Sequence, residues 1–311
     1  MIEKPMDILS LYPVRKSRKQ KQAFRQDVME YAKSLGYEVA EEKGSFGSRN
    51  LVIGDPGKAK DLITAHYDTC ARLPFPNLIT PCSFWGFLGY QLFTLVIMFG
   101  LLAMVGFGVH LASGNFELAY MTSYVCLWLL LLVMLIGPAN PVNANDNTSG
   151  VVAILDLMRN LPEDQRDEIC FVLFDLEETG LMGSSSYASK HKEQIPNQMV
   201  WNLDCIGDGE EIWVFPTKKL RKDETRLSRV RHFCTDSEKK PVVLREKGFS
   251  VYPSDQSNFP YAVGIAAFHR NRYGMLYLSK IHTPKDTCLD EENVSILCSR
   301  LKDLLTGNTV Q

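Results

Sequence analysis

Two long uncharged stretches constrain this chain more than any other feature of its sequence. Phe84–Leu111 runs for 28 residues and Leu118–Gly137 for 20 residues without an Asp, Glu, Lys or Arg. A helix needs roughly 20 residues to cross the hydrocarbon layer of a bilayer, and a core helix of a soluble protein rarely stays apolar on every face. The sequence therefore predicts a transmembrane helical hairpin over residues 84–137, in preference to two buried core helices.

The charges that flank the hairpin predict its orientation. The link Ala112–Glu117 has no Lys or Arg, whereas the cluster Arg15–Lys21 and Arg72 lie outside the hairpin on its other side. Because Lys and Arg accumulate on the cytoplasmic side, we expect a multi-pass membrane protein with two helices and a cytoplasmic catalytic domain. The eight cysteines form no CxxC pair, which favours buried thiols in a reducing compartment. The first residues lack the apolar core of a secretory signal, so we expect none.

Composition narrows the function of the rest of the chain. Hydrophobic residues make up 45% and charged residues 23%, which is typical of a folded protein. The formal net charge is −2, so no excess of positive charge points to a nucleic-acid partner.

Outside the hairpin, the sequence alternates between strand-like and helix-like segments. Helices are predicted at 17–35, 149–161, 183–191, 223–237 and 289–305, and strands at 37–39, 51–54, 62–65, 169–176, 198–204 and 263–268. The continuous apolar run Ile169–Leu176 is typical of a strand covered on both faces. This alternation predicts an α/β fold with a mostly parallel sheet between helix layers. Residues 1–83 and 138–311 then form a single discontinuous catalytic domain, into which residues 84–137 are inserted.

Polar side chains follow several predicted strands directly. His66 follows LITA, Glu177 follows FVLFDL and Asp204 follows MVWNL. In open α/β sheets, ligands bind at the carboxyl ends of the strands. Several acids at one such edge would repel one another strongly unless cations neutralised them. Two divalent metal ions bridged by a carboxylate would satisfy this requirement.

The order HxD … NDNxSG … EE … D … HTxxDT resembles the zinc exopeptidases of the M28 peptidase family, over residues 50–75 and 140–305. The resemblance implies a zinc-exopeptidase-like three-layer α/β/α sandwich with a mostly parallel mixed sheet. It also implies two zinc ions per chain. Carried over position by position, it gives five metal ligands: His66 and Asp204 for one zinc, Glu178 and His282 for the other, and Asp146 bridging both. Glu177, beside a ligand, is expected to be the general base.

Three further acids are expected to support the site. Asp68, two residues after His66, is counted with the catalytic residues because it can accept the second N–H of that imidazole and fix its tautomer. Asp286 is expected to do the same for His282. The segment SDQSNF resembles a family segment near the site, so Asp255 either shapes the pocket or caps a plain turn.

The function implied is hydrolysis of peptide bonds by a membrane-anchored di-zinc metallopeptidase at the cytoplasmic membrane face. An aminopeptidase is favoured, because most two-metal members of the family with these motifs release N-terminal residues. A carboxypeptidase with the same metal site stays open, as does a glutaminyl-cyclase-like acyltransferase that works with one zinc. A receptor or scaffold on an inactive fold should have lost a ligand or the base, and none is missing. Cys70 and Cys205, close to ligands in sequence, are expected to be packed thiols.

The hairpin is the chief departure from the family pattern, because it lies between the first and second ligand-bearing segments. Both of its ends are therefore expected at the active-site face. We hypothesise that it faces the catalytic opening toward the lipid bilayer and helps form the substrate entrance. The expected partners are a peptide substrate, hydrophobic or membrane-associated, and the bilayer itself. Self-association of the hairpin into a homo-oligomer stays open.

Overall fold

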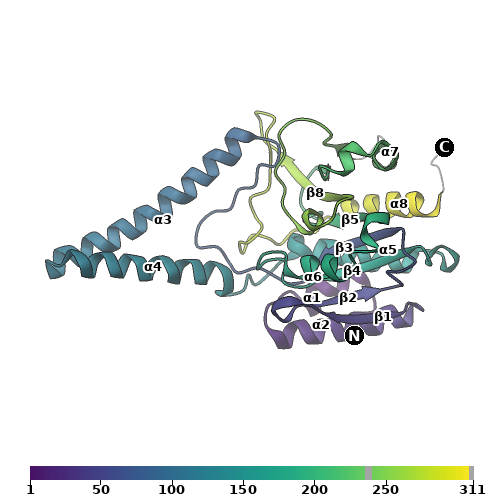
Figure 1. Cartoon of the computed structure of the whole chain (residues 1–311), viewed down its shortest axis with the longest axis horizontal. Helices are drawn as coiled ribbons and strands as arrows, with labels where there is room; N and C mark the ends of the chain where they lie inside the picture. The colour runs from purple at the N-terminus through teal and green to yellow at the C-terminus, as the bar shows by residue number, and fades with distance from the viewer. Residues whose placement is uncertain (235–239, 308–311) are drawn as a thin grey trace.

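The protein is built on one mixed sheet flanked by helices, from which a pair of long helices projects (Figure 1). The structure is a computed structural model that describes residues 1–234 and 240–307. The nine strands of the sheet are β1 Val39–Lys43, β2 Arg49–Ile53, β3 Asp61–His66, β4 Ile169–Phe174, β5 Met199–Leu203, β6 Glu211–Pro216, β7 Val242–Leu244, β8 Ala262–Arg270 and β9 Leu276–Tyr277. The helices are α1 Ile8–Leu11, α2 Arg18–Ser34, α3 Phe84–Ser113, α4 Phe116–Ile136, α5 Gly150–Asn160, α6 Met182–Lys190, α7 Glu224–Phe233 and α8 Glu291–Thr306.

The strand order is β1-β2-β4-β3-β5-β8-β6-β7, with β9 beside β8. The four central strands, β4, β3, β5 and β8, run parallel to one another. Strands β2 and β6 pair antiparallel with the outer members of this group. Because parallel neighbours end at the same edge of a sheet, the carboxyl ends of β3, β4 and β5 meet there.

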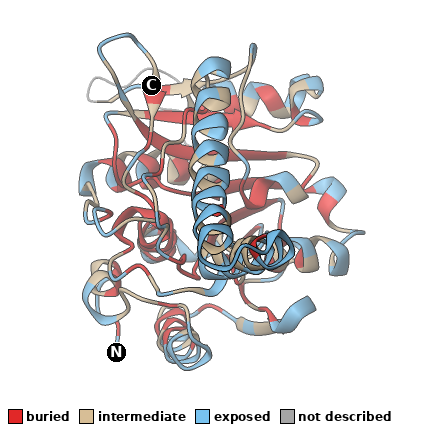
Figure 2. Cartoon of the chain, turned by 90° about the vertical axis from the view of Figure 1, so that its left-hand side faces the viewer, coloured by how far each residue is buried: buried red, intermediate tan, exposed pale blue. Residues whose placement is uncertain are grey.

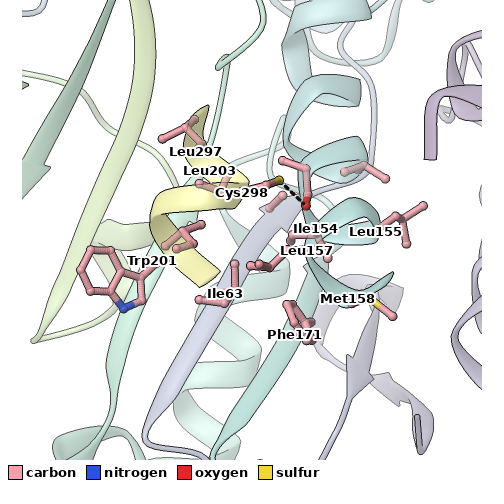
Figure 3. Close-up of a cluster of buried hydrophobic side chains, with 14 of the residues drawn as sticks. Ile63, Ile154, Leu155, Leu157, Met158, Phe171, Trp201, Leu203, Leu297 and Cys298 are labelled. Carbon is pink, nitrogen blue, oxygen red and sulfur yellow. Dashed lines mark hydrogen bonds between the residues drawn. The ribbon is translucent and has the colours of Figure 1, made fainter. Parts of the chain in front are cut away.

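Successive side chains of the central strands point to opposite faces of the sheet, and helices cover both faces. In β4, Phe171 and Leu173 belong to the larger core cluster, which also contains residues of α2, α5, α7 and α8. Cys170, Val172 and Phe174 point to the opposite face, where Tyr187 of α6 packs. Figure 3 shows part of the larger cluster, in which α8 packs against α5 through the Cys298 thiol, which donates to the Ala153 carbonyl oxygen at 3.3 Å. The predicted three-layer sandwich is confirmed.

Most predicted elements are present, with shifted ends. The Ser17 side chain caps α2 by accepting the backbone N–H of Gln20, and the Gln20 side chain accepts the backbone N–H of Ser17. Of the helix predicted at 223–237, α7 ends at Phe233, and residues 235–237 lie outside the described residues. Strands β6, β7 and β9 were not predicted from the sequence. Strand β6 pairs with β8 over six residues, so a neighbour distant in sequence defines it.

The hairpin helices are separated by a short turn with clear helix-end signals. Gly114 adopts a left-handed φ of 67° and ends α3, a conformation that favours glycine. Asn115 then caps α4, because its side chain accepts the backbone N–H of Leu118 at 3.0 Å. At the other end of α3, the Ser83 side chain accepts the N–H of Gly86.

Neither hairpin helix is buried in the protein. Leu102 is the buried residue of α3 and Ala119 that of α4. Figure 2 looks toward the hairpin and shows its exposed surface in front of the buried strands. Both helices are long and apolar enough to cross a membrane, and only 6% of the apolar window of each is buried. They are therefore not the core helices of the alternative interpretation.

Candidate metal centre

The ends of three neighbouring strands and the segments that follow them bring four of the expected site residues to one edge of the sheet. His66 is the last residue of β3, and Asp204 directly follows β5. Glu177 and Glu178 lie in the loop after β4. Since β4, β3 and β5 are adjacent and parallel, their side chains converge, as expected for the carboxyl edge of such a sheet.

Asp146 lies between the two histidines of the site. It belongs to the buried turn Ala144–Ser149, which leads into α5. One carboxylate oxygen, Oδ1, is 3.3 Å from Nε2 of His66. The other oxygen, Oδ2, is 3.0 Å from Nε2 of His282. The two oxygens therefore face different imidazoles, which is the arrangement that a bridging ligand requires.

Each histidine also has a second acid beside the same ring nitrogen. Nε2 of His66 is 3.6 Å from Oδ1 of Asp204, and Nε2 of His282 is 3.4 Å from Oε2 of Glu178. Glu177 groups with His66 and Asp204, with ligand atoms all within 4.8 Å of one another. The site thus divides into two clusters that share Asp146 as their common neighbour.

The donor atoms of both clusters suit zinc. Imidazole nitrogens and carboxylate oxygens are common zinc ligands, and several buried acids need cations nearby to be stable. Oε1 of Glu178 is buried and has no hydrogen-bond partner in the described part of the chain, so it is free to act as a ligand. His66, Asp204 and Asp146 could hold one cation, and His282, Glu178 and Asp146 another.

Without cations, the site binds protons instead. Burial disfavours the charged form of His282, but Glu178 and Asp146 outweigh this effect and raise its pKa to about 9. Burial raises the pKa of Glu178 to about 8 and that of Glu177 well above its ordinary value. Metal ligands must release such protons before they coordinate. Cation binding by these ligands would therefore be coupled to proton release.

The Asp68 carboxylate holds the two glutamates by their backbone. It accepts the N–H of Glu177 at 3.0 Å and that of Glu178 at 3.3 Å. The ring nitrogen Nδ1 of His66 is nearer to the main-chain carbonyl oxygen of Asp68, at 3.1 Å, than to its carboxylate, at 3.6 Å. In this geometry the carbonyl orients the imidazole, a role predicted from the sequence for the carboxylate.

Asp286 supports the site through a different partner from the one expected. Its carboxylate accepts the backbone N–H of Asn145 at 2.7 Å and that of Asp146 at 3.1 Å. It therefore fixes the turn that carries the shared carboxylate rather than the imidazole of His282. Burial raises the pKa of Asp286 to about 7. His282 itself has a left-handed φ of 58°, and its carbonyl accepts the backbone N–H of Leu73 at 3.1 Å.

Asp255 is fully buried at the start of the short helix Asp255–Asn258. Burial raises its pKa to about 7. Burial is the main cause of the raised pKa of Glu177, and the charge of Asp255 adds to it.

Three nearby side chains were not expected to take part in the site. The thiol of Cys70 lies with the Glu178 cluster, and that of Cys205 lies with the two aspartates. Burial raises the pKa of both thiols. The fully buried Arg15 donates to the carbonyl oxygens of Tyr67 and Tyr12 and to the Thr148 hydroxyl. In the sequence Arg15 was one cation of a basic cluster, so no local signal could distinguish it.

A cavity of about 270 Å³ opens onto the site. Its polar end is formed by His66, Asp146, Glu177, Glu178, Asp204 and His282. Its other walls are mostly apolar and come from Leu78, Ile79, Thr80, Phe87, Tyr90, Gln91, Cys205, Val251, Tyr252, Pro253 and Ile281. The lining residues, all from the described part of the chain, include acids but no Lys or Arg.

Comparison with known proteins identifies the family. The model of peptidase family M28 matches residues 133–296, just over half of the chain. The chain belongs to peptidase family M28. The match contains every expected site residue after the hairpin, whereas His66 and Asp68 precede it. A curated relative, aminopeptidase YwaD of Bacillus subtilis (strain 168), is 39% identical over 79 residues. That alignment covers 24% of this chain and only 17% of the length of YwaD.

Solved structures share the fold of this M28 chain at low sequence identity. The LapA aminopeptidase of Legionella pneumophila has a TM-score of 0.57 and 16% identity, over 99% of this chain and 68% of LapA. The glutaminyl cyclase of Porphyromonas gingivalis has a TM-score of 0.60 and 14% identity, over 97% of this chain and 95% of the cyclase. The glutaminyl cyclase of Tannerella forsythia gives a TM-score of 0.61, with the same identity and coverage. The fold alone therefore does not distinguish peptidase from cyclase chemistry.

Proposed function

We propose that this M28 protein is a membrane-anchored aminopeptidase that hydrolyses peptide bonds with two zinc ions. The observation that carries this proposal is the position of Asp146, whose two carboxylate oxygens face His66 and His282 separately. His66 and Asp204 would hold one zinc, Glu178 and His282 the other, and Asp146 would bridge them. Bound zinc would supply Lewis-acid polarisation of the scissile carbonyl and a lowered pKa for a coordinated water.

The residues of the chain would then move the proton and fix the geometry. Glu177 would accept the proton of the attacking water and pass it to the leaving amine, as a general base and then a general acid. Asp68 would hold Glu177 in place through its backbone N–H. Asp286 would do the same for the Asp146 turn.

The charge of the cavity favours an aminopeptidase over a carboxypeptidase. A free substrate carboxylate is usually bound by Arg or Lys, and the residues that line the cavity include neither. The fully buried Arg15 does not line the cavity, and its guanidinium donates to protein oxygens. The acids of the cavity instead suit the ammonium group at a peptide N-terminus.

A glutaminyl-cyclase-like acyltransferase is the second candidate, because cyclases match the fold over 97% of this chain. It would work with one zinc. The presence of a second acid beside each histidine favours two cations.

We further propose that α3 and α4 span the membrane with both ends of the hairpin cytoplasmic.

The test uses the full chain purified in detergent. The zinc content per chain would be measured by mass spectrometry, and a peptide library would be digested and read in the same way. The proposal predicts two zincs and peptides shortened by one residue from the N-terminus. One zinc with cyclised N-terminal glutamine would favour the cyclase, and C-terminal trimming would favour a carboxypeptidase.

A further inference from the structure

The first turns of α3 pack directly on the catalytic part of the protein. The Tyr90 hydroxyl shares its one proton between two acceptors, the carbonyl oxygen of Pro76 at 3.1 Å and Oδ1 of Asn77 at 3.2 Å. The rings of Phe84 and Phe249 make an edge-to-face contact with centroids 5.4 Å apart. This end of α3 is therefore held as a structural part of the domain, not attached through a free linker.

Three residues of α3 line the cavity that contains the site. Phe87, Tyr90 and Gln91 have i, i+3 and i+4 spacing, so they share one face of the helix. The histidines and acids of the two clusters lie at the polar end of the same cavity. A substrate held at the polar end would place neighbouring atoms against this face of α3.

The chain between His66 and α3 fixes this wall relative to the site. Ile79 forms a β-bridge with Leu278, and the side-chain amide of Asn77 donates to the carbonyl oxygen of Ile281 at 3.2 Å. These contacts join the start of α3 to the segment that carries His282. The distance from the α3 wall to the ligands is therefore set by hydrogen bonds rather than by a flexible loop.

The same helix continues as an exposed apolar surface. Leu92 is 53% exposed and Val96 71%, and the hairpin helices separate toward the sheet (Figure 1). Contacts between them lie farther out, where the Ser123 hydroxyl donates to the carbonyl oxygen of Leu102. Leu92 and Val96 lie about 140° and 180° around the helix from Phe87, so the cavity wall and this exposed apolar surface occupy opposite sides of α3.

We propose that the first two turns of α3 form the pocket for the side chain of the substrate's N-terminal residue, and that they select an apolar residue. This inference rests on the proposed aminopeptidase function and specifies its substrate class. The acids at the polar end would hold the ammonium group. Phe87 and Tyr90, which line the cavity together with Leu78, Ile79 and Val251, would bury an apolar side chain.

The test compares Phe87→Ala with Leu92→Ala, an apolar residue of the same helix that does not line the cavity. Zinc-loaded full-length protein in detergent would be assayed with Leu-, Phe-, Ser- and Lys-amide substrates that differ only in the first residue. Since contacts with one apolar group change selectivity about 10–200-fold, Phe87→Ala should lower kcat/KM for the Leu and Phe substrates at least tenfold. The effect should be mainly on KM, the Ser substrate should change less than threefold, and Leu92→Ala should match the wild type.

Controls separate a pocket from a merely structural role. Phe87→Leu should restore much of the preference for apolar residues, and the zinc content of all variants should stay unchanged. An equal loss on all four substrates, or equal behaviour of Phe87→Ala and Leu92→Ala, would overturn the inference.

A binding measurement keeps this inference distinct from the proposed function. If the wild type cleaves none of the substrates, the aminopeptidase proposal fails. Thermal shifts with leucinamide and serinamide would then test the pocket alone. A larger shift with leucinamide that disappears in Phe87→Ala would support the pocket, and equal shifts in the wild type would overturn it.

Discussion

Helices α5 and α3 are both rich in apolar residues, yet they have opposite surroundings. In α5, eight of the 11 residues are buried against the sheet and its neighbouring helices. In α3, one residue of 30 is buried. The difference follows from pattern and length, since α5 is short and carries polar residues such as Asp156 and Arg159 on one side, whereas α3 is apolar all round.

The comparison shows that apolar content does not determine what covers a helix. An apolar stripe needs only one protein surface to cover it. A helix that is apolar on all faces must be surrounded completely, and the sheet cannot do this for a helix that projects from it. The following predictions test this contrast between the domain and the hairpin.

The largest effect is expected within the catalytic domain. Glu177→Gln should lower turnover by at least about 10²–10⁴-fold, because the amide cannot accept the proton of the attacking water. Zinc content should stay unchanged, since Glu177 is not an expected ligand. Asp146→Asn should lower both zinc content and rate. Near-normal activity of Glu177→Gln would refute the assignment of the base.

A charge should distinguish the exposed apolar residues of the two regions. Leu101 in α3 is 45% exposed, and Phe46 in the domain is 82% exposed. Leu101→Lys should reduce the fraction of protein in alkali-washed membranes, because a central charge costs about 2.5–3.5 kcal/mol on insertion scales. Phe46→Lys should leave this fraction unchanged. Equal membrane fractions for both variants would contradict the assignment of α3 to the membrane.

Truncation of a phenylalanine should also have different effects in the two regions. Phe171 is fully buried in β4, whereas Phe99 of α3 is 60% exposed. Phe171→Ala should lower the free energy of unfolding by about 3–5 kcal/mol through lost burial and a cavity. Phe99→Ala should change it by less than about 0.5 kcal/mol. Denaturant unfolding of the domain in detergent would measure both values, and similar losses would mean that Phe99 is covered within the protein.

The smallest effect is expected from pH, and only in the domain. The pKa of His282 rises from 6.5 to about 9 in the metal-free protein, so between these values the folded state holds a proton that the unfolded chain releases. The metal-free domain should therefore lose stability as pH rises from about 7 to 9, while its zinc affinity increases. Glu178, with its pKa raised to about 8, acts in the same direction. Unfolding and zinc titrations at the two pH values would measure this, and zinc affinity that does not rise with pH would contradict it.

Much of the domain was predictable because local patterns determine it. The cap at Ser17 and the apolar run after Ile169 both gave elements close to those observed. The positions of His66 and Asp204 at strand ends were equally visible. Strand β6 was missed because its pairing with β8 depends on a distant partner.

The supporting contacts of the site were less predictable than its main residues. Asp286 holds the backbone of Asn145 and Asp146 from about 140 residues away along the chain, and no spacing rule gives such a partner. The contacts of Asp68 depend on how the loops after β3 and β4 fold against each other. The role of α3 in the cavity wall also depends on tertiary packing, since Phe87 and Leu92 are both ordinary apolar residues of one helix.

Strand β3 lies between β4 and β5 in the sheet, although the hairpin separates it from both along the chain. During synthesis from the N-terminus, β3 and His66 leave the ribosome before α3 and α4, whereas both partner strands leave after them. The hydrogen-bonding edges of β3 must stay unpaired until the hairpin has been made. The cluster around Asp146 can assemble only after that step, so a chain interrupted within the hairpin cannot form the site.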